Sequence, residues 1–155
     1  MTASTPGVTT TQVHQIFVKA NPDEIWEAIT KPEFSAKYFY GAKVETTAEA
    51  GTPFRQYSPD GTTLWVDELV LESDRPRHLV IGWRALYDPN LADEPSSRVS
   101  WDIELQDGGY CLPTVTHDRL EGAPKTAASV AGVGWMLVLS GLKTVLETGN
   151  SLVGD

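Results

Sequence analysis

Cysteine is nearly missing from this sequence, and histidine is scarce. Cys111 is the one cysteine among 155 residues, so the chain cannot form an internal disulfide, and we expect a cytoplasmic protein. The three histidines lie far apart, and no pair has the spacing of a helical zinc site. Glycine-rich loops of the kind that hold phosphates are missing too. We therefore predict no metal and no cofactor.

Positive charge is also scarce. The chain has 12 Lys and Arg against 21 Asp and Glu, for a net charge of -9, and none of the basic residues forms a run. Nucleic acids are bound largely through clustered Lys and Arg that neutralise phosphates, so nucleic-acid binding is excluded. No stretch approaches the length of apolar sequence that crosses a bilayer, so we expect no membrane span.

What is present is typical of one globular domain. Hydrophobic residues make up 41% of the chain and charged residues 21%, and a chain of this length can enclose one core. The Thr-rich start has neither a basic beginning nor an apolar segment, so it does not resemble a secretory signal. We predict a disordered N-terminal tail over residues 1–11, a single domain over 12–150 and a C-terminal tail over 151–155.

Turn residues divide the middle of the chain into short β-like runs. Short connections join antiparallel neighbours, whereas a parallel pair needs a long crossover. Pro113 lies inside the last run and predicts a bulge or an edge position, because proline cannot donate to a sheet ladder. The predicted antiparallel meander covers residues 42–47, 52–57, 63–72, 77–84, 97–105 and 110–120, after a first strand over 12–20.

Helix signals flank this β-rich region. Asn21 and Pro22 predict the start of a short helix, and residues 33–40 predict a second short helix or turn. Residues 125–148 predict one long helix that stops at Gly149. More than half of its circumference is apolar, so this helix must be enclosed rather than laid on a surface.

The order of these elements predicts an α+β fold of the helix-grip type. A curved antiparallel sheet of about six to seven strands would wrap around the long C-terminal helix, with two short helices after the first strand. A curled sheet and a rod-like helix need not fill all the space between them. The fold therefore predicts a concave apolar site between helix and sheet.

Four segments resemble the START-like superfamily of helix-grip domains, and within it the branch similar to the activator of the heat-shock-protein-ninety ATPase. They are ANPDEIWEAITKPE at 20–33, SRVSWDIE at 97–104, THD at 116–118 and GWMLVLSGLKTVLETG at 134–149. The resemblance implies a cavity for lipids, steroids, polyketides or other apolar molecules, with cyclases as a minority. Homodimer formation and contact with a chaperone stay open.

Aromatic residues are the strongest candidates for the wall of such a cavity. The alternative for each of them is ordinary core packing, because large apolar side chains are usually buried for that reason alone. The predicted ligand-binding residues are Trp26, Phe34, Tyr38, Phe39, Phe54, Trp65, Trp83, Trp101, Trp135 and Leu139.

Glycines inside the predicted long helix need an explanation, because each costs up to about 1 kcal/mol relative to alanine. Gly132, Gly134 and Gly141 predict either a close approach of the sheet backbone or space for a ligand.

Acid/base chemistry has weaker support. His117 and Asp118 are adjacent, but neighbours on a strand point to opposite faces. Glu68 or Glu72 could instead enter the cavity beside an arginine.

Three functions therefore stay open. The first is binding of a small apolar or amphipathic molecule, without catalysis as its main activity. The second is a cyclase or dehydratase that uses a carboxylate or His117 in the same cavity. The third is a co-chaperone-like interaction module. A buried polar cluster in the cavity would favour the enzyme, a filled core the interaction module, and an open apolar cavity the binding protein.

Overall fold

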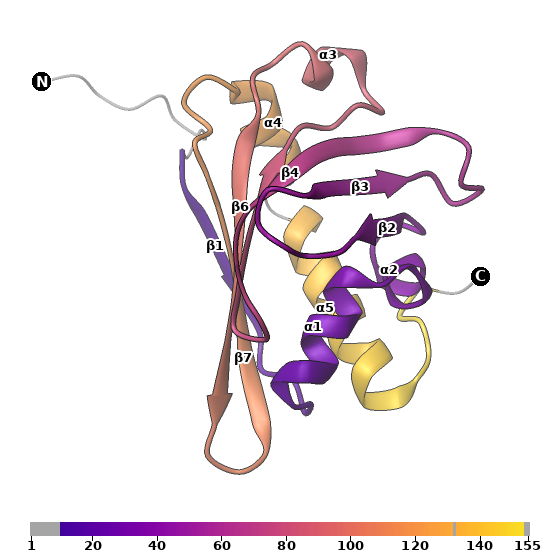
Figure 1. Cartoon of the computed structure of the whole chain (residues 1–155), viewed down its shortest axis with the longest axis vertical. Helices are drawn as coiled ribbons and strands as arrows, with labels where there is room; N and C mark the ends of the chain where they lie inside the picture. Colours follow the sequence, from indigo (N-terminus) through magenta and orange to yellow (C-terminus); the bar gives the residue numbers. More distant parts are fainter. Residues whose placement is uncertain (1–9, 132, 154–155) are drawn as a thin grey trace, which may run out of the picture.

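A seven-stranded antiparallel sheet curves around a C-terminal helix in the computed structural model of the chain, which describes residues 10–131 and 133–153 (Figure 1). This confirms the predicted α+β helix-grip class. The strands are β1 (Gln12–Gln15), β2 (Lys43–Thr46), β3 (Pro53–Tyr57), β4 (Leu64–Asp74), β5 (His78–Trp83), β6 (Ser97–Gln106) and β7 (Tyr110–Asp118). The helices are α1 (Pro22–Thr30), α2 (Pro32–Tyr38), α3 (Pro89–Ala92), α4 (Pro124–Val130) and α5 (Val133–Thr148).

The strand order is β1-β7-β6-β5-β4-β3-β2, so β2 to β7 form the expected meander and β1 closes one edge beside β7. The first strand is shorter than predicted and ends at Gln15, although Val18 still forms a bridge with Cys111. Pro113 corrects another expectation, because β6 and β7 pair without a bulge and β7 is an inner strand. Pro113 lies just beyond the regular β1–β7 ladder, which ends at Thr114, and its carbonyl oxygen still accepts a hydrogen bond from the N–H of Ile16, at 3.4 Å.

The start of α1 follows directly from its sequence. The Asn21 side chain accepts a hydrogen bond from the backbone N–H of Glu24, at 2.8 Å. The Glu24 carboxylate in turn accepts one from the N–H of Asn21, at 3.0 Å. These reciprocal bonds form a capping box, and Pro22 occupies the first turn, where its missing N–H costs nothing.

The predicted long helix is in fact two helices. Ala131 has an extended conformation, with φ -69° and ψ 158°, which interrupts the helical hydrogen bonds. As a result α4 and α5 are inclined to each other by 43°. Gly132 lies outside the described residues. In the part of the chain that the structure describes, no single helix is long and apolar enough to cross a membrane; only α4 and α5 taken together reach that length and apolar character.

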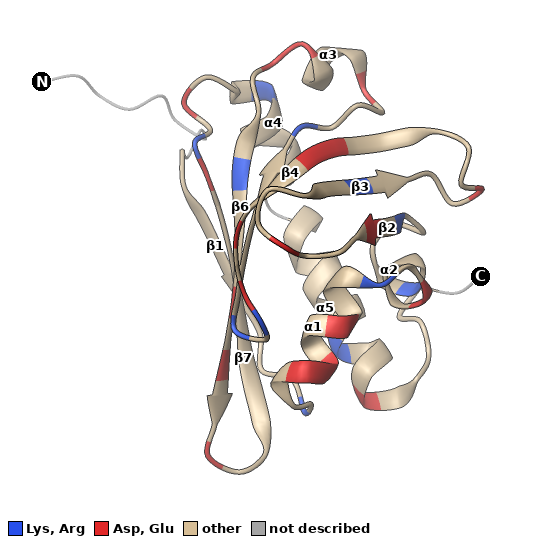
Figure 2. Cartoon of the chain, in the orientation of Figure 1, with Lys and Arg blue, Asp and Glu red and all other residues tan. Residues whose placement is uncertain are grey.

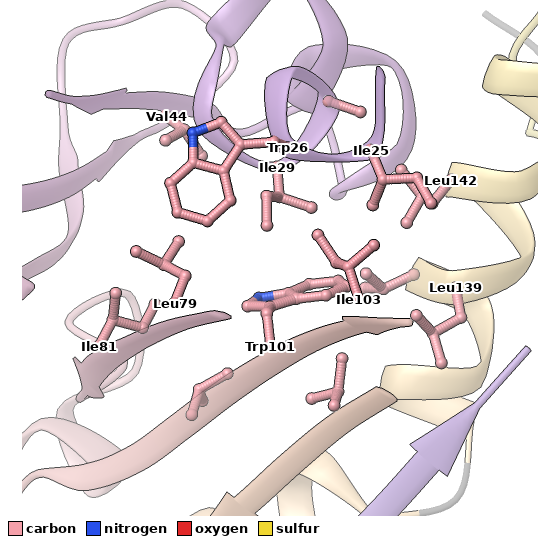
Figure 3. Packing of buried hydrophobic residues seen from close by; sticks show 14 of the residues in the cluster. Ile25, Trp26, Ile29, Val44, Leu79, Ile81, Trp101, Ile103, Leu139 and Leu142 are labelled. Atoms are coloured by element: carbon pink, nitrogen blue, oxygen red, sulfur yellow. The ribbon is translucent and has the colours of Figure 1, made fainter. Parts of the chain in front are cut away.

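The core fills the space between α1, α5 and the inner face of the sheet. Figure 3 shows Ile25 and Trp26 of α1 pointing toward Trp101 and Ile103 of β6, with Leu142 of α5 beside Ile25. None of these five side chains is more than 4% exposed. Each such burial contributes about 1.5–3 kcal/mol, so this cluster holds α1 and α5 against the sheet.

Gly141 of α5 packs closely against Tyr38, the last residue of α2. A Cβ atom at Gly141 would lie 3.0 Å from the Cβ of Tyr38 and 3.3 Å from its carbonyl oxygen. The glycine therefore serves close packing, but the neighbouring backbone is that of α2 and not that of the sheet.

Candidate functional site

An apolar pocket of about 360 Å³ opens between the α4–α5 pair and the β3–β5 end of the sheet. Its size lies within the range of sites for small molecules. The pocket lies along the N-terminal half of α5, whose Trp135 and Val138 also belong to the core, and the C-terminal half contributes Leu142 and Val145 to the core. Its lining residues are Phe39, Tyr40, Gln56, Trp65, Trp83, Tyr87, Ser129, Val130, Gly134, Trp135 and Val138.

Three rings from three different elements form one aromatic wall. Phe39 follows α2, Trp83 ends β5 and Trp135 lies in the first turn of α5. The ring centroids of Phe39 and Trp83 are 6.0 Å apart, those of Phe39 and Trp135 5.9 Å, and those of Trp83 and Trp135 6.0 Å. The rings meet at tilted or edge-to-face angles, which are favoured for aromatic pairs. Each ring fixes the other two, so the wall is preformed.

A second wall is built by Trp65 and Tyr87, whose ring centroids are 5.6 Å apart. The pairing of β3 with β4 passes from Gln56–Val66 to Tyr57–Leu64, so Trp65 is the extra residue of a β-bulge. A bulge redirects a side chain that would otherwise follow strict alternation. The backbone N–H of Leu86 also donates to the carbonyl oxygen of Trp65, at 2.9 Å, which ties the segment after β5 to the bulge.

Two tyrosines flank the pocket and are half exposed. Tyr40 is 54% exposed and Tyr87 52%. The hydroxyl of Tyr40 donates to the carbonyl oxygen of Gly134, at 3.3 Å, and so links α2 to the start of α5. Tyr40 has a φ of 52°, in the left-handed region that costs energy for a bulky residue. Burial, and secondarily the neighbouring Tyr40, raise the pKa of Tyr87, which therefore stays neutral near pH 7.

A buried polar relay lies against the first aromatic wall. The indole N–H of Trp135 donates to Nδ1 of His117, at 3.2 Å. This bond leaves the ring proton on Nε2, which faces the hydroxyl oxygen of Ser97 at 2.7 Å. The Ser97 hydroxyl in turn donates to the carbonyl oxygen of Trp83, at 3.3 Å. Two residues of the wall are thus connected through His117, which is fully buried.

The relay holds His117 in its neutral form. Burial lowers the pKa of His117 to about 4. Asp118, its sequence neighbour, forms a two-bond ion pair with Arg98 instead, at 2.8 and 2.6 Å. The structure therefore separates the two members of the predicted acid/base pair, as expected for neighbours on a strand.

The two candidate glutamates also lie away from the pocket lining. Glu68 accepts a hydrogen bond from Ser96 at 3.1 Å, and burial is the main cause that raises the pKa of its carboxyl group. Glu72 is exposed and contacts His78 at the surface, with its carboxylate oxygen 3.2 Å from Nε2.

The segment between β5 and β6 supports the pocket from outside. Its Glu94 carboxylate accepts hydrogen bonds from the backbone N–H groups of Lys125 and Thr126, at 2.9 and 2.7 Å, and from the Thr126 hydroxyl at 2.8 Å. Burial raises the pKa of Glu94, but these bonds and the Lys125 charge outweigh it and lower the pKa overall. Glu94 thus caps α4, which carries the lining residues Ser129 and Val130 and has no cap from its own N-cap residue, Ala123.

The described lining is uncharged. Neither Lys, Arg, Asp nor Glu occurs among the residues that line the pocket. Figure 2 shows charges spread over the strands, the loops and α1, while the half of α5 next to α4 carries none. Gln56 is the one strongly buried amide side chain among the lining residues, at 3% exposed. Among the described residues its amide group makes no hydrogen bond. The wall also contains the indole N–H of Trp83, which is fully buried and has no hydrogen-bond partner in the part of the chain that the structure describes.

Four of the ten predicted ligand-binding residues line this pocket: Phe39, Trp65, Trp83 and Trp135. The other six belong to the core or pack against it, because α1 and α2 cover that part of the sheet. These are Trp26, Phe34, Tyr38, Phe54, Trp101 and Leu139. The predicted set did not include the lining residues Tyr40 and Tyr87, although both are aromatic. It also did not include Gln56, which could have been found because it follows Phe54 by two residues and so shares its face of β3.

The fold and the aromatic-walled pocket define the chain as a helix-grip domain. The family model described as activator of Hsp90 ATPase homolog 1-like protein matches residues 19–147. The chain therefore belongs to this family, which confirms the resemblance found in the sequence. The comparison with curated proteins gave no match.

Several solved structures share the fold. Protein MLL2253 from Mesorhizobium loti is 20% identical with a TM-score of 0.72, over 88% of this chain and 96% of that one. The Aha1 dimer from Colwellia psychrerythraea is 18% identical with a TM-score of 0.69, over 91% and 98%. DynU16, from the dynemicin biosynthetic locus, is 22% identical with a TM-score of 0.71, over 92% of this chain and 49% of its own. At these identities the likeness shows the fold.

Proposed function

We propose that this protein binds a small, mostly apolar molecule in the pocket between α4–α5 and the β3–β5 end of the sheet. The observation that carries the proposal is the open volume of about 360 Å³ beside Trp135 and Val138, in a region where the sheet and the helix do not close on each other. An apolar cavity with few polar groups is how proteins commonly hold small apolar ligands.

The chemistry of the lining favours binding over catalysis. The described lining residues carry neither a carboxylate nor an imidazole, and both ring nitrogens of His117 are occupied by the relay behind the wall. Aromatic contact and neutral hydrogen bonds are what this surface offers. The open pocket likewise favours a binding protein over an interaction module with a filled interior.

Gly134 provides a direct test. A Cβ atom there would meet only the carbonyl oxygen of Ser129, at 3.6 Å, which is an ordinary contact. A larger side chain at this lining position therefore adds atoms to the pocket wall without a forced clash. We expect naphthalene to bind the wild-type protein in calorimetric titrations and Gly134→Leu to weaken binding at least tenfold while the melting temperature stays nearly unchanged.

Two outcomes would count against the proposal. One is a wild-type protein that takes up no naphthalene, and the other is binding that Gly134→Leu leaves intact. Ser140→Leu is the matched control, because Ser140 lies on α5 but is not a lining residue. Native mass spectrometry of protein purified from its own cells would then identify the molecule that occupies the site.

A further inference from the structure

We infer that the ligand is an uncharged, ring-containing molecule of roughly a dozen non-hydrogen atoms, with one hydrogen-bonding group that meets the side-chain amide of Gln56. The inference rests on the proposed function and specifies the class of ligand. It assigns Gln56 as the residue that sets specificity for a neutral polar group.

The position of Gln56 is the first argument. It lies on β3, pairs with Val66 of β4 and lines the pocket. Its neighbour on the same face, Phe54, is buried in the core. The sheet therefore carries this amide inward among apolar side chains, where a Leu or Val would be the ordinary choice.

The missing partner is the second argument. Gln56 is 3% exposed, and its amide forms no hydrogen bond within the described residues. A buried amide without a partner is costly, and most buried polar groups in proteins are paired. The amide nitrogen and oxygen are nevertheless not sealed inside the protein, since neither is among the fully buried unpaired atoms. The pocket is the space from which a partner can reach them.

The lining also restricts the charge and shape of the ligand. A charged group in this wall would have no countercharge among the described lining residues, so its desolvation would not be compensated. Two clusters of rings line the cavity, one of Phe39, Trp83 and Trp135 and one of Trp65 and Tyr87. Aromatic surfaces of this kind favour a flat ring system.

The volume limits the size of the ligand. A cavity of about 360 Å³ holds on the order of a dozen water-sized groups, at about 30 Å³ for each. Two fused six-membered rings with one substituent match this number. Naphthalene, 2-naphthol and 2-naphthoate therefore form a matched series that differs only in the polar group.

The experiment measures the affinity of each compound for the wild-type protein and for Gln56→Leu. This substitution keeps the approximate volume and removes the amide. We expect the preference for 2-naphthol over naphthalene to fall about tenfold in Gln56→Leu, which corresponds to 1.4 kcal/mol and to the strength of a neutral hydrogen bond. We also expect 2-naphthoate to bind the wild type at least tenfold more weakly than 2-naphthol.

A control variant and a stability measurement distinguish a specific effect at Gln56 from a general effect on folding. Gln106→Leu changes a glutamine in the β6–β7 hairpin whose side chain, within the described residues, bonds only to the carbonyl oxygen of Glu104, so it should leave the preference unchanged. Gln56→Leu itself should unfold at the same or a higher urea concentration, because it removes an unpaired buried amide.

The failures of the two proposals differ. If the wild type binds none of the three compounds, the proposed function fails. If naphthalene binds but the ratio of its affinity to that of 2-naphthol is the same in Gln56→Leu as in the wild type, only the assignment of Gln56 is overturned. Tighter binding of 2-naphthoate than of 2-naphthol would overturn the inference that the ligand is uncharged.

Discussion

The indole N–H of Trp135 donates to Nδ1 of His117 across 3.2 Å, and this bond joins α5 to β7 behind the pocket wall. It requires a neutral imidazole, because a proton on Nδ1 would face the N–H of Trp135. The orientation of one pocket residue is thus tied to the protonation state of a buried histidine that does not line the pocket.

Acid should therefore destabilise the protein through His117. Its pKa is about 4 in the folded state against 6.5 for the unperturbed group, so between these values the unfolded chain binds a proton that the folded protein excludes. The free energy of unfolding should fall by about 3 kcal/mol as pH is lowered from 7 to 4. Urea unfolding at several pH values measures the loss of stability. In His117→Asn the side chain cannot titrate, so the part of the loss that comes from His117 should be absent.

His78 supplies a comparison of opposite sign. The hydrogen bond to Asp102, only partly offset by burial, and the neighbouring Glu72 raise the pKa of His78. Its contribution is therefore present at low pH and is lost as pH rises through the folded-state pKa. The His78→Asn variant should still lose unfolding free energy in acid, whereas the His117→Asn variant should not show this loss. If the unfolding free energies of wild type and His117→Asn fell in parallel with decreasing pH, a neutral, buried His117 would be contradicted.

Gly141 and Gly134 should respond differently to the same change. Gly141→Leu forces a side chain against the Tyr38 backbone, where a Cβ already comes within 3.0 Å, and should cost about 1–3 kcal/mol. Gly134→Leu should cost much less, since Gly134 borders the pocket. Denaturant unfolding of both variants tests this contrast, and equal losses would show that Gly134 is also a close-packing position.

Removing the cap on α4 should loosen the outer part of the pocket. Glu94→Ala leaves two backbone N–H groups of α4 without their acceptor, and loss of an N-cap costs about 0.5–2 kcal/mol. Naphthalene affinity should fall as well, because α4 carries two lining residues. Glu121→Ala is the control, since Glu121 is exposed and bonds to none of the described residues. An unchanged unfolding curve for Glu94→Ala would refute the capping role.

The tryptophans should divide into two classes. Trp101 is 4% exposed and lies in the centre of the core, so Trp101→Ala should cost about 3–5 kcal/mol. Trp65 is only partly buried and faces the pocket. Trp65→Ala should therefore affect naphthalene binding more than stability. Thermal unfolding and calorimetry on the two variants measure both effects, and a larger stability loss in Trp65→Ala would contradict the division.

The sequence by itself determined the fold class, the order of the seven strands and the positions of the first two helices. Those features depend on local patterns: the capping residues Asn21 and Glu24, the turn residues between strands, and the apolar circumference of the C-terminal helical region. Each pattern acts within a few residues, and the tertiary structure preserves it.

Only the tertiary structure decided where the pocket lies. Trp101 and Trp65 are indistinguishable as aromatic residues on strands, yet α1 covers the first, while a β-bulge turns the second toward the pocket. The break at Ala131 separates α4 from α5 and lets both border the same space. Whether a side chain lines a void depends on which distant segments pack against it, and that information is not contained in any local pattern.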